Sequence, residues 1–443
     1  MDNLKNFCRT NYCGELRLSD AGKTVSLCGW VQRQRDLGGL IFVDLRDRTG
    51  LVQLSFDDST AKDIFEKAST LRSEYVVAAT GLVRERESKT NKIATGDIEV
   101  YVSELRLLAK AETPPFEIVE NSKANDMLRL KYRYLDLRNP AVKKNIILRC
   151  NVVAALRKSM TEHGFLEITT PILTASSPEG ARDYLVPARK HPGKFYALPQ
   201  APQQFKQLLM TSGFDRYFQI APCFRDEDAR GDRSPGEFYQ LDMEMAFATQ
   251  EDVFAVLEDV LPPIFAKFGT YDVASAAPFR RIPYNTALET YGSDKPDLRI
   301  DLTCKNVTHL FENSEFEPLR GQTVKMVDIS DCALTRKQVE KLLSDCEVQS
   351  GSKAYWFKVD EKGELAGGIA KFVTGLRSQL EQVLTLAPNT LVVVAAGAAA
   401  TKSAGVLIKT FGAACAGHMD QERYEFCWIV DFPMYEIGDE SGE

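Results

Sequence analysis

The chain has 443 residues, enough for two or three domains, and its 44% hydrophobic and 26% charged residues are ordinary for a soluble globular protein. The net charge of −7 argues against indiscriminate binding of nucleic acid, and no apolar run is as long as a membrane span. The N-terminal residues do not resemble a signal peptide, so we expect a cytoplasmic protein without a membrane partner. The 10 cysteines are scattered and the histidines number only 4, which fits neither a zinc site nor a disulfide framework.

The first hundred residues show the alternation of a small β-barrel. Three strands, a helix and two strands indicate an OB-type barrel, which either binds oligonucleotides on its second and third strands or serves as a structural module. The alternation places Phe42 and Gln53 on the outer, polar face, near Arg33 and Arg35. An aromatic ring, an amide and two cations suit single-stranded RNA. The predicted strands are 25–34, 40–46, 51–56, 76–86 and 98–107, and the predicted helix is 61–71.

A connector rich in cations follows the barrel. Pro114 and Pro115 end the last strand, and LRLKYRYLDLR then forms either a solvated hinge or a contact for a nucleic-acid backbone. The apolar spacing over 141–162 predicts an amphipathic helix that ends near Gly164. A strand is expected next in GFLEITTPIL, closed by Pro171.

The stretch 216–245 reads as two antiparallel strands joined by a long loop of alternating charge. Such a pair with one polar face is either a half-solvated hairpin or one wall of a site, and periodicity alone does not choose between them. Glycines in the loop give the backbone freedom to fold over a ligand. The polar face comprises Gln219, Ala221, Cys223 and Arg225 on the first strand and Gln240, Asp242 and Glu244 on the second.

Two further segments carry candidate polar side chains. The small-residue loop TASSPEGARDYLVP holds Glu179, although most loops of this kind are surface turns. In ALPQAPQQFKQLLM, Pro202 suits a helix start and places Gln203 and Lys206 on one helix face. A cation in the first helical turn is disfavoured by the helix dipole, so Lys206 predicts an anion nearby unless it is an ordinary surface lysine.

The last third of the chain alternates strands and helices as a compact α/β domain does. We expect strands at 324–329, 355–359 and 391–395, helices at 336–343 and 369–384, and a final strand in FCWIVDFPMYEI. Gly367 and Gly368 lack the spacing of a phosphate-binding loop, so they give only a weak indication of a site.

Several of these motifs resemble the class II aminoacyl-tRNA synthetases, and in particular the bacterial-type aspartyl-tRNA synthetases. FRDE at 224–227 matches the Phe-Arg-x-Glu signature of motif 2, and the helix, strand and proline over 141–171 resemble motif 1. RDLGGLIFVDLRD and GLVQLSF resemble the anticodon-binding barrel of the aspartyl enzymes, and the run GSDKPDLR at 292–299 resembles the bacterial type.

The resemblance implies an α+β multidomain fold: an OB-type barrel, a class II antiparallel-sheet catalytic core and an inserted α/β domain. The implied division is an anticodon-binding barrel over 1–110, a hinge over 111–140, a catalytic core with motifs 1 and 2 over 141–300, an inserted domain over 301–420 and a return to the core over 421–443.

The implied activity is aspartate–tRNA ligation, in which L-aspartate is activated with ATP and passed to the 3′ end of tRNA(Asp), and in some relatives also to tRNA(Asn). Magnesium is expected on the ATP phosphates, with no metal ligand assignable in the chain. Motif 1 implies a homodimer. The implied residues are Arg225 for catalysis; Glu179, Gln203, Lys206, Arg225 and Asp242 for aspartate; Arg225, Asp226 and Glu227 for ATP; and Arg35, Phe42, Gln53 and Glu99 for the anticodon.

The chain departs from the family at its end, because no motif 3 follows the strand in FCWIVDFPMYEI. We therefore expect the 443-residue chain alone to be inactive or nearly so. Two alternatives stay open: an asparaginyl or lysyl relative, disfavoured by Lys206 and the GSDKPDLR run, and a non-catalytic tRNA-binding protein with an incomplete core.

Overall fold

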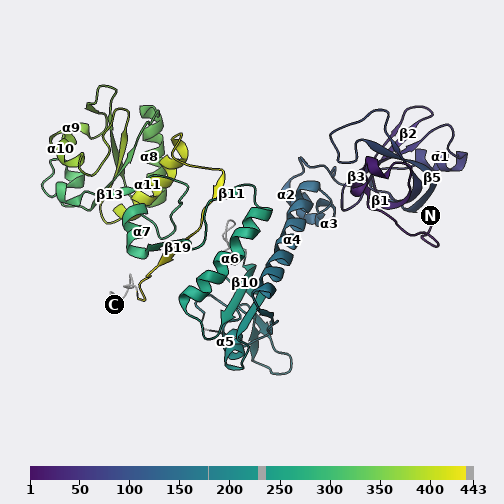
Figure 1. The fold of residues 1–443 in the computed structure, drawn as a ribbon, viewed down its shortest axis with the longest axis horizontal. Coiled ribbons are helices and arrows are strands. Elements are labelled where there is room, and N and C mark those ends of the chain that lie inside the picture. Colours follow the sequence, from purple (N-terminus) through teal and green to yellow (C-terminus); the bar gives the residue numbers. More distant parts are fainter. Residues whose placement is uncertain (178, 228–235, 436–443) are drawn as a thin grey trace. The chain divides into compact units, whose positions relative to one another are not determined.

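The computed structural model describes residues 1–177, 179–227 and 236–435 (Figure 1). The chain divides into two compact units, Met1–Arg149 and Cys150–Glu443, and each is described by itself. Among the helices of the described ranges, none is both long enough and apolar enough to cross a membrane.

A closed five-stranded barrel forms the larger part of the first unit, and its strands run in the order β1-β2-β3-β5-β4. Antiparallel pairing of β1 with β4 and parallel pairing of β3 with β5 close the sheet, which confirms the predicted OB-type barrel. The elements are β1 (Thr24–Asp36), β2 (Ile41–Arg46), β3 (Leu51–Phe56), α1 (Lys62–Ser69), β4 (Val76–Glu85) and β5 (Ile98–Ala109), preceded by 3-10 turns at Cys13–Glu15 and Leu18–Asp20.

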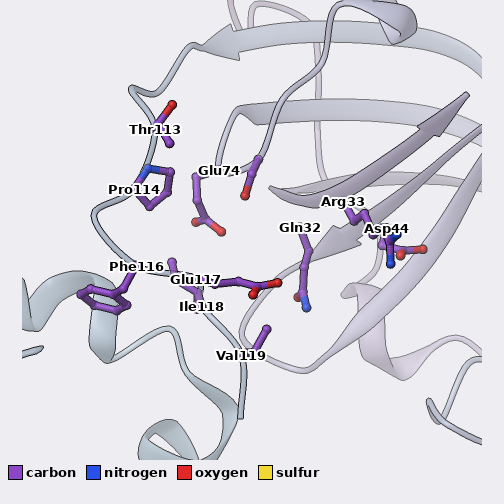
Figure 2. Close-up of a pocket in the computed structure, with 11 residues that line it drawn as sticks. Gln32, Arg33, Asp44, Glu74, Thr113, Pro114, Phe116, Glu117, Ile118 and Val119 are labelled. Atoms are coloured by element: carbon purple, nitrogen blue, oxygen red, sulfur yellow. The ribbon is translucent and has the colours of Figure 1, made fainter. Parts of the chain in front are cut away.

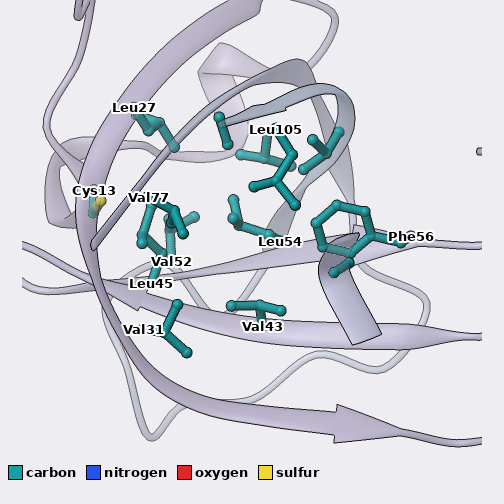
Figure 3. Close-up of a cluster of buried hydrophobic side chains, with 14 of the residues drawn as sticks. Cys13, Leu27, Val31, Val43, Leu45, Val52, Leu54, Phe56, Val77 and Leu105 are labelled. Atoms are coloured by element: carbon teal, nitrogen blue, oxygen red, sulfur yellow. The ribbon is translucent and has the colours of Figure 1, made fainter. Parts of the chain in front are cut away.

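The barrel closes because every strand points one row of apolar side chains inward. In β1 buried and less buried residues alternate, so that Val25, Leu27 and Val31 lie inside. Figure 3 shows these side chains meeting those of the other strands, with Leu54 and Phe56 among them. Burial of such a row on all five strands supplies the main favourable term for this fold.

A buried ion group ties the connector to the barrel. Glu74, in the turn before β4, accepts from Nη2 of Arg46 at 2.7 and 2.8 Å and from Nη1 of Arg138 at 2.5 Å. The side chains of Arg46 and Glu74 are only 4% and 3% exposed. Arg138, which follows the short helices α2 (Asp126–Lys131) and α3 (Arg133–Asp136), also lies over the ring of Trp30. One carboxylate therefore holds two cations from distant parts of the chain.

The second unit contains the predicted strand pair, β9 (Arg216–Phe224) and β10 (Glu237–Met245). They are antiparallel over nine residues, from Arg216 opposite Met245 to Phe224 opposite Glu237. The apolar face packs under helices α4 (Pro140–Glu162) and α6 (Gln250–Phe268), with Phe218 at the centre of the cluster. The predicted pairing and the predicted helix over 141–162 are both confirmed.

The strand predicted in GFLEITTPIL is much shorter than expected. Only β6 (Leu166–Glu167) forms, paired in parallel with β9, in a sheet of order β10-β9-β6. The ladder ends because the backbone N–H of Thr170 donates to the side chain of Gln219, and Pro171 has no N–H to donate. Near this sheet the chain forms β7 (Leu185–Pro187), β8 (Phe195–Ala197) and α5 (Gln203–Thr211).

A five-stranded sheet of order β13-β14-β17-β15-β16 carries the α/β part. Helices α8 and α11 pack on one face, and α9 and α10 pack on the other. The elements are β13 (Cys304–Asn306), β14 (Val324–Ile329), α8 (Arg336–Ser350), β15 (Ala354–Val359), β16 (Leu365–Ala366), α9 (Ala370–Val373), α10 (Arg377–Leu380), β17 (Leu391–Ala396) and α11 (Ala400–Ala414), with 3-10 turns at Thr308–Leu310, Glu317–Leu319 and Thr374–Leu376.

Two expectations for this part were wrong. The single helix predicted over 369–384 is broken into α9, a 3-10 turn containing Gly375, and α10, because glycine weakens a helix interior. The helix α11 was not predicted, although its buried residues recur at helical spacing: Ala400, Ser403, Ala404, Leu407, Ile408, Phe411 and Gly412.

Short elements connect the core to the α/β part. The predicted strand in FCWIVDFPMYEI is present as β19 (Cys427–Val430), and it pairs in parallel with β12 (Arg280–Pro283). In the same way β11 (Asp272–Val273) pairs with β18 (Arg423–Tyr424), and α7 (Tyr284–Tyr291) ends at Gly292 in a left-handed conformation. The domain limits at 110, 140, 300 and 420 stay predictions.

Candidate functional site

A buried ion cluster joins α5 to the polar face of β10. Nζ of Lys206 lies 2.9 Å from Oδ1 of Asp242 and 3.3 Å from Oε2 of Glu244, and its side chain is 13% exposed. Burial lowers the pKa of Lys206, but the hydrogen bond and charge of Asp242, with those of Glu244, outweigh it and leave the pKa raised. The position of Lys206 in the first turn of a helix predicted a nearby anion, and the structure has two, Asp242 and Glu244.

The carboxylate of Asp242 is only partly satisfied. It is 8% exposed, and Oδ2 is buried without a hydrogen-bond partner among the described residues. Beside it on β9, the buried amide of Gln219 accepts from the backbone and hydroxyl of Thr170 and from the hydroxyl of Tyr217. Burial and the charge of Asp242 raise the pKa of Tyr217. A buried oxygen without a donor is costly, so Asp242 presents an acceptor suited to a ligand ammonium.

The thiol of Cys223 lies within electrostatic reach of four predicted site residues. Burial, and then the charge of Asp242, raises its pKa to about 11; Glu179 acts in the same direction, whereas Arg225 and Lys206 oppose the rise. All four side chains therefore act electrostatically on the Cys223 thiol, and two of them, Lys206 and Asp242, are in direct contact. Cys223 itself contacts Oε1 of Gln240 at 3.3 Å.

The loop that carries Glu179 is held beside this face by Gln200. The amide of Gln200, 1% exposed, accepts from the backbone N–H of Ala181 and donates to its carbonyl at 2.9 Å and to Asp183 at 2.6 Å. Arg182 and Asp226 exchange contacts, since the N–H of Asp226 donates to the Arg182 carbonyl and Nε of Arg182 to the Asp226 carbonyl. The loop is therefore fixed to the end of β9.

Arg225 comes directly after β9 and has unused hydrogen-bonding capacity. Its guanidinium lies 5.1 Å from the centre of the Phe238 ring, and Nε is buried with no acceptor among the described residues. Asp226 and Glu227 are exposed, and Gln203 is half-buried at the start of α5. A planar cation with free N–H groups is suited to a phosphate or a carboxylate.

The second predicted site lies on the outer face of the barrel, where three of its four residues form a chain of contacts. Nη2 of Arg35 donates to Oε1 of Gln53 at 3.2 Å, and Nε2 of Gln53 donates to Oε2 of Glu99 at 2.8 Å. The Arg35 guanidinium also lies 5.9 Å from the centre of the Phe42 ring. All four predicted residues are thus adjacent.

The outer face differs from the expectation in one respect. Gln53 points outward but is 8% exposed, because Arg35 and Glu99 cover it. Arg35 is in turn paired with Asp44 at 2.8 Å, and Glu99 with Arg84 at 2.7 Å. Strand alternation gives the side of a sheet to which a residue points, but it does not give what covers the residue there.

A cavity of about 770 Å³ opens in the first unit between the barrel and the segment 113–119. Figure 2 shows Gln32, Arg33 and Asp44 on the barrel side and Glu117 reaching toward them from the connector. Its lining mixes both signs of charge, so it does not by itself indicate one class of ligand.

The comparisons with known proteins agree with this geometry. The family model described as tRNA synthetases class II (D, K and N) matches residues 125–440, and the model described as an OB-fold nucleic acid binding domain matches residues 25–108. The chain belongs to the class II tRNA synthetases. The family is one of aminoacyl-tRNA ligases, so the resemblance drawn from motifs 1 and 2 and from the barrel is confirmed at the level of the family.

Curated relatives of this synthetase chain match it over nearly its whole length. An aspartate–tRNA ligase of Streptomyces avermitilis is 48% identical over 98% of this chain and 74% of its own, and an aspartate–tRNA(Asp/Asn) ligase of Parvibaculum lavamentivorans is 48% identical over 98% and 73%. The chain therefore spans about three quarters of the length of these relatives.

Solved class II synthetase structures share the fold. An asparaginyl-tRNA synthetase from Pyrococcus horikoshii complexed with asparaginyl-adenylate has a TM-score of 0.56 and 21% identity, covering 90% of this chain and 95% of that one. A putative aspartyl-tRNA synthetase from Leishmania major has a TM-score of 0.52 and 26% identity over 59% of this chain and 53% of that one.

Reasoning from sequence missed several polar residues that shape the synthetase site. Gln200 and Gln219 are buried amides that fix the Glu179 loop and the end of β6, and Glu244 is the second anion on Lys206. The strand period placed Glu244 on the correct face, but no local pattern marks which glutamines are buried. A buried amide is recognised only after its hydrogen-bond partners are known.

We predict that Asp242→Asn lowers the pKa of Lys206. The substitution removes the larger of the two anionic contacts while the burial of the ammonium remains. The stabilisation that a raised lysine pKa provides is complete below the ordinary value of 10.5 and is lost as pH rises through the raised value, so the variant should lose less stability at high pH. NMR titration of ¹³C-methylated lysines measures the shift. Glu237→Gln, an exposed change on the same strand, is the control, and an unchanged Lys206 titration in Asp242→Asn contradicts the prediction.

Proposed function

We propose that the chain is the aspartate-activating and tRNA-binding part of an aspartate–tRNA ligase. The observation that carries this proposal is the ion cluster of Lys206 with Asp242 and Glu244 on the polar face of β10. Arg225 follows the end of β9, and the loop that carries Glu179 is hydrogen-bonded to the chain at the same strand end. Cations and anions alternate there as an amino acid with two carboxylates and an ammonium requires. The curated relatives named aspartate–tRNA ligase support the choice of aspartate.

Each charged residue suits one part of L-aspartate. The ammonium of Lys206 would bind the side-chain carboxylate of the substrate while it keeps its contacts with Asp242 and Glu244. The unsatisfied Oδ2 of Asp242, together with Glu179, would accept from the substrate ammonium, and Gln203 would bind the backbone carboxylate. Because Lys206 sits between two anions in the structure, its position is fixed before the substrate arrives, which reduces the entropy lost on binding.

Activation requires no nucleophile from the enzyme. The substrate carboxylate attacks the α-phosphorus of ATP in line, and pyrophosphate leaves. Arg225 would bind the α-phosphate and the attacking carboxylate together, and its Nε, which has no acceptor among the described residues, is available for that contact. Asp226 and Glu227 would bind the adenine side of ATP, and the 3′-terminal hydroxyl of tRNA would then accept the aspartyl group.

Magnesium would be held at this site chiefly by the nucleotide. No group of three or more histidine, cysteine or acidic residues within the described ranges could hold a metal by itself. Bound to the ATP phosphates, the ion would neutralise charge on the leaving pyrophosphate. Arg225 and Lys206 would contribute to orienting the reactants on the protein side.

The barrel face would recognise the anticodon. Phe42 would supply a ring on which a base stacks. The amide of Gln53 and the carboxylate of Glu99 would form hydrogen bonds with base edges, and Arg35 holds Gln53 and contacts the Phe42 ring. The bound tRNA would be tRNA(Asp). If the chain acts like its relatives named aspartate–tRNA(Asp/Asn) ligase, tRNA(Asn) would be a second substrate.

We predict that Arg225→Ala weakens binding of the analogue 5′-O-(aspartylsulfamoyl)adenosine about 10- to 100-fold. A hydrogen bond to a charged group contributes about 1.5–3 kcal/mol, which is this range of affinity. Isothermal titration calorimetry measures it without requiring turnover. Arg216→Ala, at the opposite end of β9, should bind as the wild type does, and unchanged binding by Arg225→Ala would remove Arg225 from the site.

The same titration tests the choice of amino acid. Lys206→Met should weaken the aspartyl analogue more than the asparaginyl one, because only the aspartyl side chain carries a charge for Lys206. Equal losses for both analogues would place Lys206 outside the side-chain subsite.

We predict that Phe42→Ala weakens binding of a tRNA(Asp) transcript about 10- to 100-fold, since one aromatic–base stack contributes about 1–3 kcal/mol. The ring carries no charge, so the dependence of log K on log salt should keep its slope. Fluorescence titration with tRNA(Asp) and tRNA(Asn) measures both quantities. Phe247→Ala, which alters a fully exposed ring outside the barrel, is the control. Wild-type affinity in Phe42→Ala would exclude anticodon stacking on this ring.

We further propose that a second copy of the chain covers the outer edge of β6. This strand is the edge of its sheet, and apolar side chains near it are exposed: Leu166 by 54%, Ile172 by 45% and Leu173 by 53%. Exposed apolar clusters of this kind mark interfaces. The resemblance of 141–171 to motif 1 supports the same interface.

Sedimentation should therefore give a dimer at micromolar concentration, and Leu166→Glu should shift it to the monomer. Burying a charge there would cost several kcal/mol without a partner. Val348→Glu, on the exposed side of α8, is the matched control and should remain dimeric. A monomeric wild type would contradict the proposal.

A further inference from the structure

Two cysteines distant in sequence meet in the α/β part, away from the proposed site. Sγ of Cys332 and Sγ of Cys415 lie 3.5 Å apart, and both are free thiols. Cys332 follows β14, where its N–H donates to the carbonyl of Asn389, and Cys415 caps the end of α11, where its N–H donates to that of Phe411. Both backbones are held by hydrogen bonds, so the contact is built into the fold.

A cation stands beside this pair. Nδ1 of His418 lies 2.7 Å from a carboxylate oxygen of Asp301, and Nε2 lies 2.8 Å from the carbonyl oxygen of Ser330. Both partners are acceptors only, so both ring nitrogens must carry a proton for both bonds to form. The imidazole is therefore the imidazolium, and these contacts outweigh burial in raising the pKa of His418.

The surroundings favour the thiolate of Cys332. The contact with Cys415, together with the N–H of Leu334 and the charges of His418 and Lys358, outweighs burial and lowers the pKa of Cys332 to about 6. The pKa of Cys415 rises, chiefly through the same contact with Cys332 and then through burial. One sulfur is thus a nucleophile at neutral pH while its neighbour keeps a proton.

Cys332 is also accessible. It is half-buried and lines a small cavity of about 40 Å³, together with Arg336, Lys358 and the ring of Trp356. A space of this size holds a molecule such as water or hydrogen peroxide. Cys415 is 6% exposed, so a reagent from solvent reaches Cys332 first.

We propose that Cys332 and Cys415 are a peroxide-responsive pair that forms a disulfide between the end of β14 and the end of α11. The Cys332 thiolate attacks one oxygen of hydrogen peroxide, the O–O bond breaks, and the leaving oxygen takes a proton to give water and a Cys332 sulfenic acid. Cys415 then attacks the sulfenic sulfur, the S–S bond forms, and the hydroxyl leaves as water with the Cys415 proton. Two thiols and one peroxide give one disulfide and two waters.

The geometry requires little movement. The sulfurs must close from 3.5 Å to about 2.05 Å, a change that side-chain rotation at the irregular segment around Cys332 can supply. Other cysteines lack the combination: Cys13 and Cys304 are buried with raised pKa values, and Cys8 and Cys150 are exposed without the cations that surround Cys332. The reaction should therefore select this pair.

The test is peroxide titration of the full chain followed by differential alkylation and mass spectrometry. The expected result is a peptide pair joined through Cys332 and Cys415, formed at peroxide doses that leave Cys8 and Cys150 free. Alkylation of Cys332 in the reduced chain at pH 7 should be at least about tenfold faster than that of Cys150, following its thiolate fraction.

Variants separate the two roles. Cys415→Ser should stop at a Cys332 sulfenic acid that dimedone traps, whereas Cys332→Ser should leave Cys415 reduced. His418→Gln should slow alkylation of Cys332 relative to Cys150 in the same sample. Two results with the wild-type chain would overturn the proposal. One is that Cys332 and Cys415 stay reduced at peroxide doses that oxidise Cys8 and Cys150. The other is that Cys332 or Cys415 forms a disulfide with a different cysteine.

Discussion

The pairing register of β9 with β10 is the constraint on which the proposed site depends. It places Gln219 opposite Asp242 and Ala221 opposite Gln240, so the polar side chains of two strands form a single face. Helices α4 and α6 cover the other face with apolar side chains. A slip of one residue would exchange the two faces, so the burial of Phe218 and Met243 beneath these helices fixes the position of every charged group in the site.

The charges on this face are arranged before any ligand binds. Lys206 is held between two carboxylates. Within the part of the chain that the structure describes, one oxygen of Asp242 has no donor and one nitrogen of Arg225 has no acceptor. A site built this way carries a cost in the folded state, because buried polar atoms lack partners. A ligand with complementary groups removes that cost on binding, which favours recognition of one charge pattern over others.

Periodic patterns predicted much of the fold, whereas the site residues were implied mainly by the resemblance to the class II synthetases. The barrel strands, β9, β10 and α4 follow from alternation and helical spacing, and Lys206 indicated its anion through the helix dipole. Sequence could not give the length of β6, because its ladder ends where the N–H of Thr170 donates to the side chain of Gln219. It also could not give the cover over Gln53. These features depend on contacts between residues far apart in the chain, which no local pattern encodes.

The carboxylate of Glu74 joins the connector to the barrel within the first unit. It neutralises Arg46 from the barrel and Arg138 from beyond the connector, and the compact unit accordingly runs to Arg149 rather than to the end of β5. A barrel excised after its last strand would keep Glu74 and Arg46 but lose the second guanidinium and its cover over Trp30. Transplanting this RNA-binding module into another protein thus calls for the hinge as well, which makes the hinge a structural part of the module rather than a passive spacer.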